Sequence, residues 1–243
     1  KTFNPELLRE YTHSHYAPEN IVISVAGNVD DSFIHTIDGY FGSFSGAEQH
    51  DSKAVPVFVA DSINRKKDTE QAHFCLGYEG LPINDPSTYS LIILNNILGG
   101  SMSSRLFQEV REKQGLAYSV FSYHTSYLDQ GLLTIYAGTG NDQLNKLKQT
   151  ITDSIEQLTE KGITDKELHN SKEQLKGNLV LSLESTNSRM SRNGRNELLL
   201  RKHRSLDEMI QEIDRVSQSS IRSVIDKVFL TKPATAIIAS DQN

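Results

Sequence analysis

The chain has 243 residues, of which 37% are hydrophobic, and its formal net charge is −6. This length and composition can supply the core of one large or two modest domains, whereas the negative charge argues against nucleic acid or an acidic membrane as a partner. No stretch approaches the roughly 18 consecutive apolar residues that span a bilayer, and we do not expect the charged first ten residues to be a signal peptide. We therefore expect a soluble globular protein without a membrane partner.

The only cysteine is Cys75, which lies in an apolar run over residues 73–78. A single cysteine excludes an intramolecular disulfide framework and a cysteine-rich structural zinc site within the chain. We expect Cys75 to act as a small buried hydrophobe. A single cysteine, without a disulfide partner in the chain, is typical of a cytoplasmic protein, and we predict that location.

The first sixty residues combine helical and strand patterns. Residues 5–16 predict the end of a helix, and Pro18 then directs the chain into an extended strand over residues 21–25. Asp30 or Asp31 can cap a following helix. The buried stripe of that helix is expected to contain Phe33, Ile34, Ile37 and Phe41.

A charged stretch over residues 61–70 marks the predicted boundary between two domains. We predict a first domain over residues 1–60, a linker over residues 61–71 and a second domain over residues 72–243. The chain begins at Lys1 without an initiator methionine, so we expect it to be a piece of a longer protein.

The second domain is predicted to begin and end with a strand and to contain several helices. Thr164 and Glu167 have the spacing of a capping box, which marks a helix start. Both ends of the chain place a helix, a proline and an apolar strand in that order, which suggests two copies of one α+β unit. The predicted strands cover residues 72–78 and 235–240, and the predicted helices include residues 87–98, 144–161, 189–200 and 221–229.

The central stretch, residues 98–138, joins a short helix to a hairpin with little connecting sequence. The glycine pair at 99–100 breaks the backbone, and the helix that follows should stop at Gly115. From residue 116 the pattern changes to a strand, with a turn at residues 129–131 and a return strand. Alternation predicts one face of the first strand to carry Tyr118, Val120, Ser122 and His124.

Common catalytic patterns are missing from the sequence. No two of the eight histidines are four residues apart, so a helical metal pair is not expected. No serine lies in a G-x-S-x-G elbow, and the stretch GGSMSSR lacks the lysine of a phosphate loop. We therefore predict no metal ligands in this chain.

Arg111 and Tyr118 are the pair that the sequence singles out for chemistry. A guanidinium at the helix end and a phenol at the strand start can converge across the Gly115 turn, where they could hold a carbonyl oxygen or an oxyanion. The alternative is a salt-bridged arginine and a core tyrosine, which the residues alone favour.

Three blocks carry a resemblance to a known family: LNNILGGSMSSRLFQEVREKQGLAYSV, SYLDQGLLTIYAG and HYAPENIVISVAGNVD. They lie in the family's order, and the sequence resembles the C-terminal half of an M16 zinc metallopeptidase, a family that contains pitrilysin, insulysin and the mitochondrial processing peptidase. The processing-protease branch is the most similar. The resemblance implies an α+β fold with a mixed sheet backed by helices, a complete second domain and a truncated first domain.

The resemblance also implies a division of the active site. In the family an H-x-x-E-H motif and a distant glutamate hold zinc in the first domain, and neither occurs in this chain. Arg111 and Tyr118 match the arginine and tyrosine that bind substrate and stabilise the oxyanion. The implied activity is peptide hydrolysis by zinc-bound water in a chamber between domains, with the zinc held by the missing N-terminal half.

The expected partners are a peptide substrate and the N-terminal M16 half, and a homodimer is also considered. We expect no catalytic residue in this chain, because the zinc ligands that the resemblance implies are missing from it, and we expect the fragment alone to be inactive. Two alternatives stay open: a non-catalytic M16-like scaffold subunit and a protein-interaction module. An intact H-x-x-E-H motif upstream would favour the enzyme.

Overall fold

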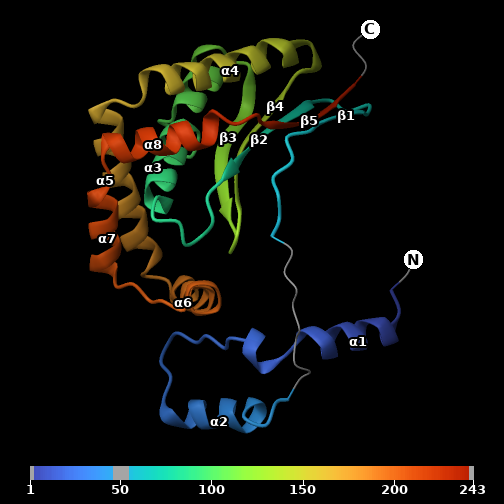
Figure 1. Cartoon of the computed structure of the whole chain (residues 1–243), viewed down its shortest axis with the longest axis vertical. Helices are drawn as coiled ribbons and strands as arrows, with labels where there is room; N and C mark the ends of the chain where they lie inside the picture. The colour runs from blue at the N-terminus through green and yellow to red at the C-terminus, as the bar shows by residue number, and fades with distance from the viewer. Residues whose placement is uncertain (1–2, 46–54, 241–243) are drawn as a thin grey trace. The chain divides into compact units, whose positions relative to one another are not determined.

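The computed structural model describes residues 3–45 and 55–240 and divides into two compact units. The first unit combines Lys1–Val55 with Asn178–Ser205, and the second combines Pro56–Gly177 with Leu206–Asn243 (Figure 1). A helical segment from late in the chain thus belongs to the first unit, which no change of composition in the sequence signals. The division into domains 1–60 and 72–243 stays a prediction.

Helices α1 (Pro5–His15), α2 (Asp31–Phe41) and α6 (Thr186–Leu200) lie in the first unit, together with the short 3-10 turn η1 (Pro18–Asn20). The Asn4 side chain accepts a hydrogen bond from the backbone N–H of Leu7 at 2.7 Å, so α1 begins at Pro5 rather than ending a longer helix. Asp30 caps α2 in the same way.

Two expectations for the first unit are wrong. Residues 21–25 form no strand, although the backbone at Ile21 is extended. The predicted buried stripe of α2 is also largely exposed, since Phe33, Ile34 and Phe41 expose 42%, 61% and 49% of their surface. Both patterns need a partner, because a strand requires a neighbour for its hydrogen bonds and an apolar stripe requires a surface to cover it.

The second unit contains a mixed five-stranded sheet in the order β1-β5-β2-β4-β3. β1 and β5 are parallel, and the other neighbours are antiparallel. Residues 62–66 of the predicted linker form an edge strand of this sheet, and the partner of that strand comes from the far end of the chain. The strands are β1 (Ser62–Lys66), β2 (Ala72–Gly80), β3 (Ala117–Ser126), β4 (Gly131–Thr139) and β5 (Ala234–Ala239).

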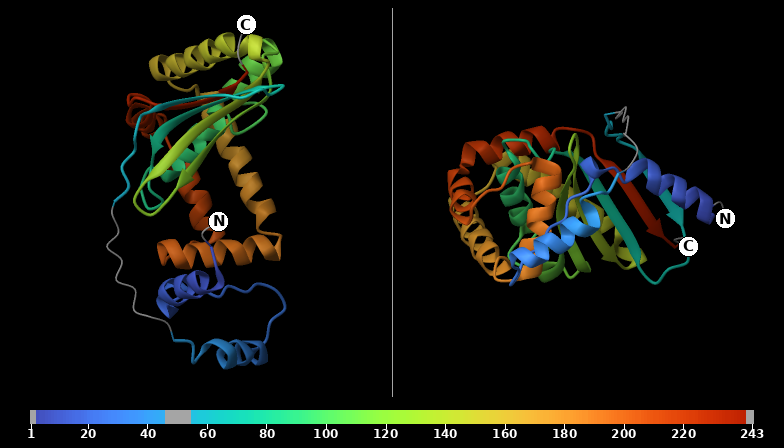
Figure 2. Two further views of the ribbon diagram at one scale, coloured as in Figure 1. Left: turned by 90° about the vertical axis from the view of Figure 1, so that its right-hand side faces the viewer. Right: turned by 90° about the horizontal axis from the view of Figure 1, so that it is seen from below.

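Helices cover one face of this sheet (Figures 1 and 2). Side chains of β2 alternate between buried and half-buried positions, and its Tyr78 meets Phe229 of α8 with ring centroids 4.8 Å apart. Burial raises the pKa of Tyr78 to about 12. The helices of this unit include α3 (Thr88–Leu98), α4 (Leu144–Lys161), α7 (Leu206–Arg215), α8 (Gln218–Phe229) and most of α5 (Asp165–Ser182).

Helices α3, α4 and α8 agree with the predicted ones to within a few residues, and Gly162, whose φ is +69°, caps the C-terminal end of α4. The predicted capping box is also confirmed: the Glu167 carboxylate accepts from the backbone N–H of Thr164, and the Thr164 hydroxyl accepts from the N–H of Glu167. Among the described residues, no helix combines the length and the apolarity that crossing a membrane requires.

Arg105 links the segment after α3 to the α4–α5 connection. Its guanidinium donates to both carboxylate oxygens of Glu167, at 2.6 and 2.9 Å, and to the carbonyl oxygen of Gly162 at 2.8 Å. Burial of the Glu167 carboxylate opposes its ionisation, but hydrogen bonds from Arg105 and Thr164 outweigh this effect and lower the pKa of Glu167 from its ordinary 4.5. The ion pair thus holds the first turn of α5 against the segment that follows α3.

Replacing Ile135 with alanine should test the core of the sheet. Ile135 lies on the central part of β4 and is fully buried, so Ile135→Ala should lower the free energy of unfolding by about 2–5 kcal/mol, measured by urea denaturation. The matched control is Ile63→Ala on edge strand β1, where the side chain is 57% exposed and the loss should stay below about 1 kcal/mol. Equal losses at both sites would contradict this core.

The Glu167 ion pair should make stability depend on pH. Because folding lowers the pKa of Glu167, its stabilising effect is present above the unfolded pKa and is lost as pH falls through the folded pKa, below 4.5. Glu167→Gln should cost about 1–2 kcal/mol at pH 7 and reduce the loss of stability on acidification. Denaturant midpoints from pH 7 to 3 measure this, with exposed Glu156→Gln on α4 as the control. Identical acid profiles for Glu167→Gln and wild type would refute it.

Candidate functional site

The helical turn that carries Arg111 is a π-helix, η2 (Phe107–Lys113), instead of the α-helix that the spacing predicted. The backbone N–H of Gln114 bonds to the carbonyl of Glu109, five residues earlier, at 3.2 Å. Fully buried Leu106 and Val110 hold the turn against the core, and Gly115, with φ +60°, ends it as predicted. Single π-helical turns are frequent at functional sites.

A bulge at the start of β3 sets the direction of Tyr118. Ala117 pairs with Thr139 of β4 and Ser119 pairs with the next residue, Gly138, so Tyr118 is an extra residue in β3. We predicted Tyr118 to share a face with Val120, which is wrong: Val120 is 5% exposed and Tyr118 is 78% exposed. The extra residue breaks the two-residue period, and Tyr118 therefore reaches the face that the helices leave open.

The structure brings Arg111 and Tyr118 together, as their spacing across the Gly115 turn suggested. The Arg111 Cζ lies 4.4 Å from the centroid of the Tyr118 ring and 4.8 Å from the centroid of the Phe107 ring. The Arg111 Nε is 3.6 Å from a carboxylate oxygen of Glu112, in an exposed pair of the kind that contributes little. The core-tyrosine alternative is wrong, whereas a role of the pair in binding substrate stays a prediction.

Phe107 is the contact that sequence reasoning missed. Its side chain is half-buried in the helical turn that carries Arg111. The available signal was the i, i+4 spacing of Phe107 and Arg111, which places two side chains on one side of a helical turn.

Further aromatic rings lie on the open face of the sheet beside this pair. Phe121 of β3 pairs across the strands with Tyr136 of β4, with ring centroids 5.1 Å apart, and Tyr123 follows at 6.1 Å from Phe121. Phe121 and Tyr123 are 42% and 47% exposed. The open face therefore offers apolar surface next to a cation and a phenol.

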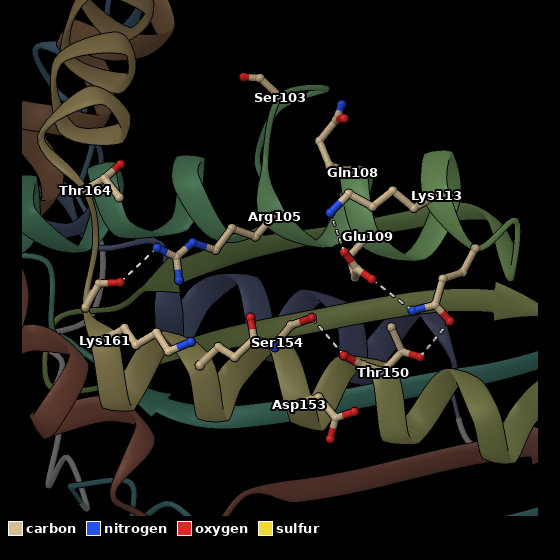
Figure 3. Close-up of a pocket in the computed structure, with 13 residues that line it drawn as sticks. Ser103, Arg105, Gln108, Glu109, Lys113, Thr150, Asp153, Ser154, Lys161 and Thr164 are labelled. Carbon is tan, nitrogen blue, oxygen red and sulfur yellow. Dashed lines mark hydrogen bonds and ion pairs between the residues drawn. The ribbon is translucent and has the colours of Figure 1, made fainter.

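A polar cavity of about 470 Å³ lies between η2 and α4, but neither Arg111 nor Tyr118 lines it (Figure 3). Several of its charged groups already have partners: Lys113 binds Glu109 at 2.8 Å, and Arg105 binds Glu167. Hydrogen bonds from Lys113 and from a neighbouring glutamine lower the pKa of Glu109. These ion pairs indicate that the charged side chains of the cavity stabilise the fold.

The described residues contain no cluster of metal-ligating side chains. No three His, Cys, Asp or Glu side chains in that part of the chain come together in a way that could hold one. The His73 ring nitrogen Nδ1 makes a hydrogen bond of 2.8 Å with the Tyr136 hydroxyl, and burial raises the pKa of the half-buried Cys75 thiol. These donors do not fit a zinc site.

Comparisons with known proteins show which family the chain belongs to. The family model described as Peptidase M16 inactive domain matches residues 2–175. The chain is 53% identical over 242 residues to the uncharacterized zinc protease YmxG of Bacillus subtilis, and 37% identical over 244 residues to an uncharacterized zinc protease of Streptomyces coelicolor. These alignments cover 100% and 95% of this chain but 59% and 52% of those relatives, so the chain spans less than two thirds of their length.

Solved structures share the fold. The peptidase M16 inactive domain from Pseudomonas fluorescens superposes with a TM-score of 0.89 at 21% identity, covering 99% of this chain and 58% of that one. A protease from Helicobacter pylori gives a TM-score of 0.83 at 22% identity, covering 98% and 59%. These likenesses confirm the α+β fold with its mixed sheet, and the family model and the relatives show that the chain belongs to the peptidase M16 family.

Proposed function

We propose that this chain forms the substrate-holding half of a zinc-dependent endopeptidase. Arg111 and Tyr118 bind the peptide and stabilise the oxyanion that develops at its carbonyl, while zinc and its ligands belong to the N-terminal half of the longer protein. The relatives named zinc proteases support a protease. The observation that carries the proposal is the contact of the Arg111 guanidinium with the exposed Tyr118 ring, at 4.4 Å.

The two side chains provide suitable chemistry. A guanidinium is charged at every relevant pH and presents several N–H donors in a plane, and a phenol adds one O–H donor. The Arg111 side chain is 34% exposed, so part of it faces solvent and can meet a ligand. Hydrogen bonds from a charged donor to a developing oxyanion are strong, and each such donor typically accelerates acyl transfer by about 100-fold or more.

The open face of the sheet supports a peptide as the ligand. Phe121, Tyr123 and Tyr136 place aromatic surface beside Arg111 and Tyr118, where apolar side chains of a substrate could pack. In the proposed enzyme the peptide occupies a chamber between the two halves, and this face forms one wall of it.

Exposed apolar side chains in the first unit support the proposal that the chain belongs to a larger protein. The helices of this unit expose apolar side chains that would normally be covered, and we infer that the N-terminal half covers them. The exposed residues include Leu8, Phe33, Ile34, Tyr40 and Phe41.

A non-catalytic scaffold subunit is the second candidate. In the part of the chain that the structure describes, no three His, Cys, Asp or Glu side chains come together to hold a metal ion, and the matching family model is described as an inactive domain. In this alternative the chain lends Arg111 and Tyr118 to a zinc-bearing partner. Zinc analysis of the purified full-length protein separates the two: bound zinc supports the enzyme, and a zinc-free protein supports the scaffold.

Substitutions at the pair should lower turnover without releasing zinc. In the full-length protease, Arg111→Ala should reduce kcat/KM about 100-fold and Tyr118→Phe about 10-fold, because each removes a donor to the oxyanion. Peptide hydrolysis by each variant, together with its zinc content, measures this.

Control variants keep the same changes away from the site. Tyr127→Phe alters a 59% exposed tyrosine beyond the end of β3, and Arg215→Ala alters an exposed arginine at the end of α7. Both should retain normal turnover. Loss of zinc from the Arg111 or Tyr118 variants, or wild-type turnover in them, would reject the proposed roles.

A further inference from the structure

We propose that Phe107 is a positioning residue that holds the Arg111 guanidinium by its flat face and so keeps its N–H donors free for the substrate. This inference rests on the proposed function of Arg111. It concerns a residue that contacts Arg111 rather than one that supplies a donor of its own.

The partners of the guanidinium differ from those of a structural arginine. Arg105 illustrates the structural case, because its nitrogens donate to the Glu167 carboxylate and to the carbonyl of Gly162. The Arg111 guanidinium instead contacts two aromatic rings, and within the described part of the chain no side chain or carbonyl accepts a hydrogen bond from it. Aromatic rings contact the face of a guanidinium, whereas its donors lie in the plane.

Of the two rings, Phe107 is the better fixed. Tyr118 is 78% exposed, whereas Phe107 is half-buried and lies next to Leu106, which is fully buried. Phe107 and Arg111 also belong to the same π-helical turn, which buried Val110 anchors. The Phe107 ring can therefore keep its contact with Arg111 when the Tyr118 hydroxyl turns toward a substrate.

Glu112 is the nearby group that could capture the guanidinium. Its carboxylate is 51% exposed and lies 3.6 Å from the Arg111 Nε, beyond hydrogen-bond distance. Without the Phe107 ring, Arg111 could turn toward this carboxylate, and donors needed by the substrate would be occupied. The ring contact thus opposes a competing ion pair.

The test uses the full-length protease with Phe107→Leu, which keeps an apolar side chain but removes the ring, and Phe107→Tyr, which keeps the ring. Phe107→Leu should lower kcat about five-fold with little change in KM, as expected for a lost cation–π contact. Phe107→Tyr should keep kcat within about two-fold of wild type. Phe107→Met, also without a ring, replaces the leucine variant if that variant does not fold.

Coupling to Arg111 separates positioning from a general structural role. In the Arg111→Ala background, Phe107→Leu should cause no further loss, because the group it positions is gone. An equal five-fold loss in both backgrounds would overturn the inference, as would wild-type kcat in Phe107→Leu while Arg111→Ala is impaired. Wild-type turnover in Arg111→Ala would instead reject the proposed function itself.

Discussion

One-sided burial of the sheet is the constraint on which the second unit depends. Phe74, Leu76 and Tyr78 of β2 and Leu133 and Ile135 of β4 all point to the face that the helices cover. An antiparallel arrangement of this kind can leave its other face to solvent, because one covered face supplies the core. The exposure of Tyr118, Phe121 and Tyr123 follows from this asymmetry, since they lie on the face that the core does not need.

Features that depend on local periodicity could be predicted from the sequence. The helical spacing over residues 144–161 and the capping box at Thr164 and Glu167 each contain their own signal, and the structure confirms them. β2 and the return strand β4 were recognisable for the same reason. Such signals need no knowledge of which segment lies next to which.

Features that depend on a distant partner could not be predicted. β1 is exposed along its length and ends in two charged residues, and it is a strand only because β5 pairs with it. The bulge at Tyr118 depends on the register with β4, so alternation placed this side chain on the wrong face. The proximity of Arg111 and Tyr118 was foreseeable from the Gly115 turn, but the Phe107 contact required the geometry of the π-helical turn.

The place of β5 in the sheet has a consequence for folding during synthesis. β5 lies between β1 and β2, yet it is the last of the described strands to leave the ribosome. The β2–β4–β3 part can assemble as soon as residue 139 emerges, whereas β1 must wait for about a hundred further residues before its partner exists. Until then one edge of β2 stays unpaired, and this nascent intermediate has an open edge to which another chain could add.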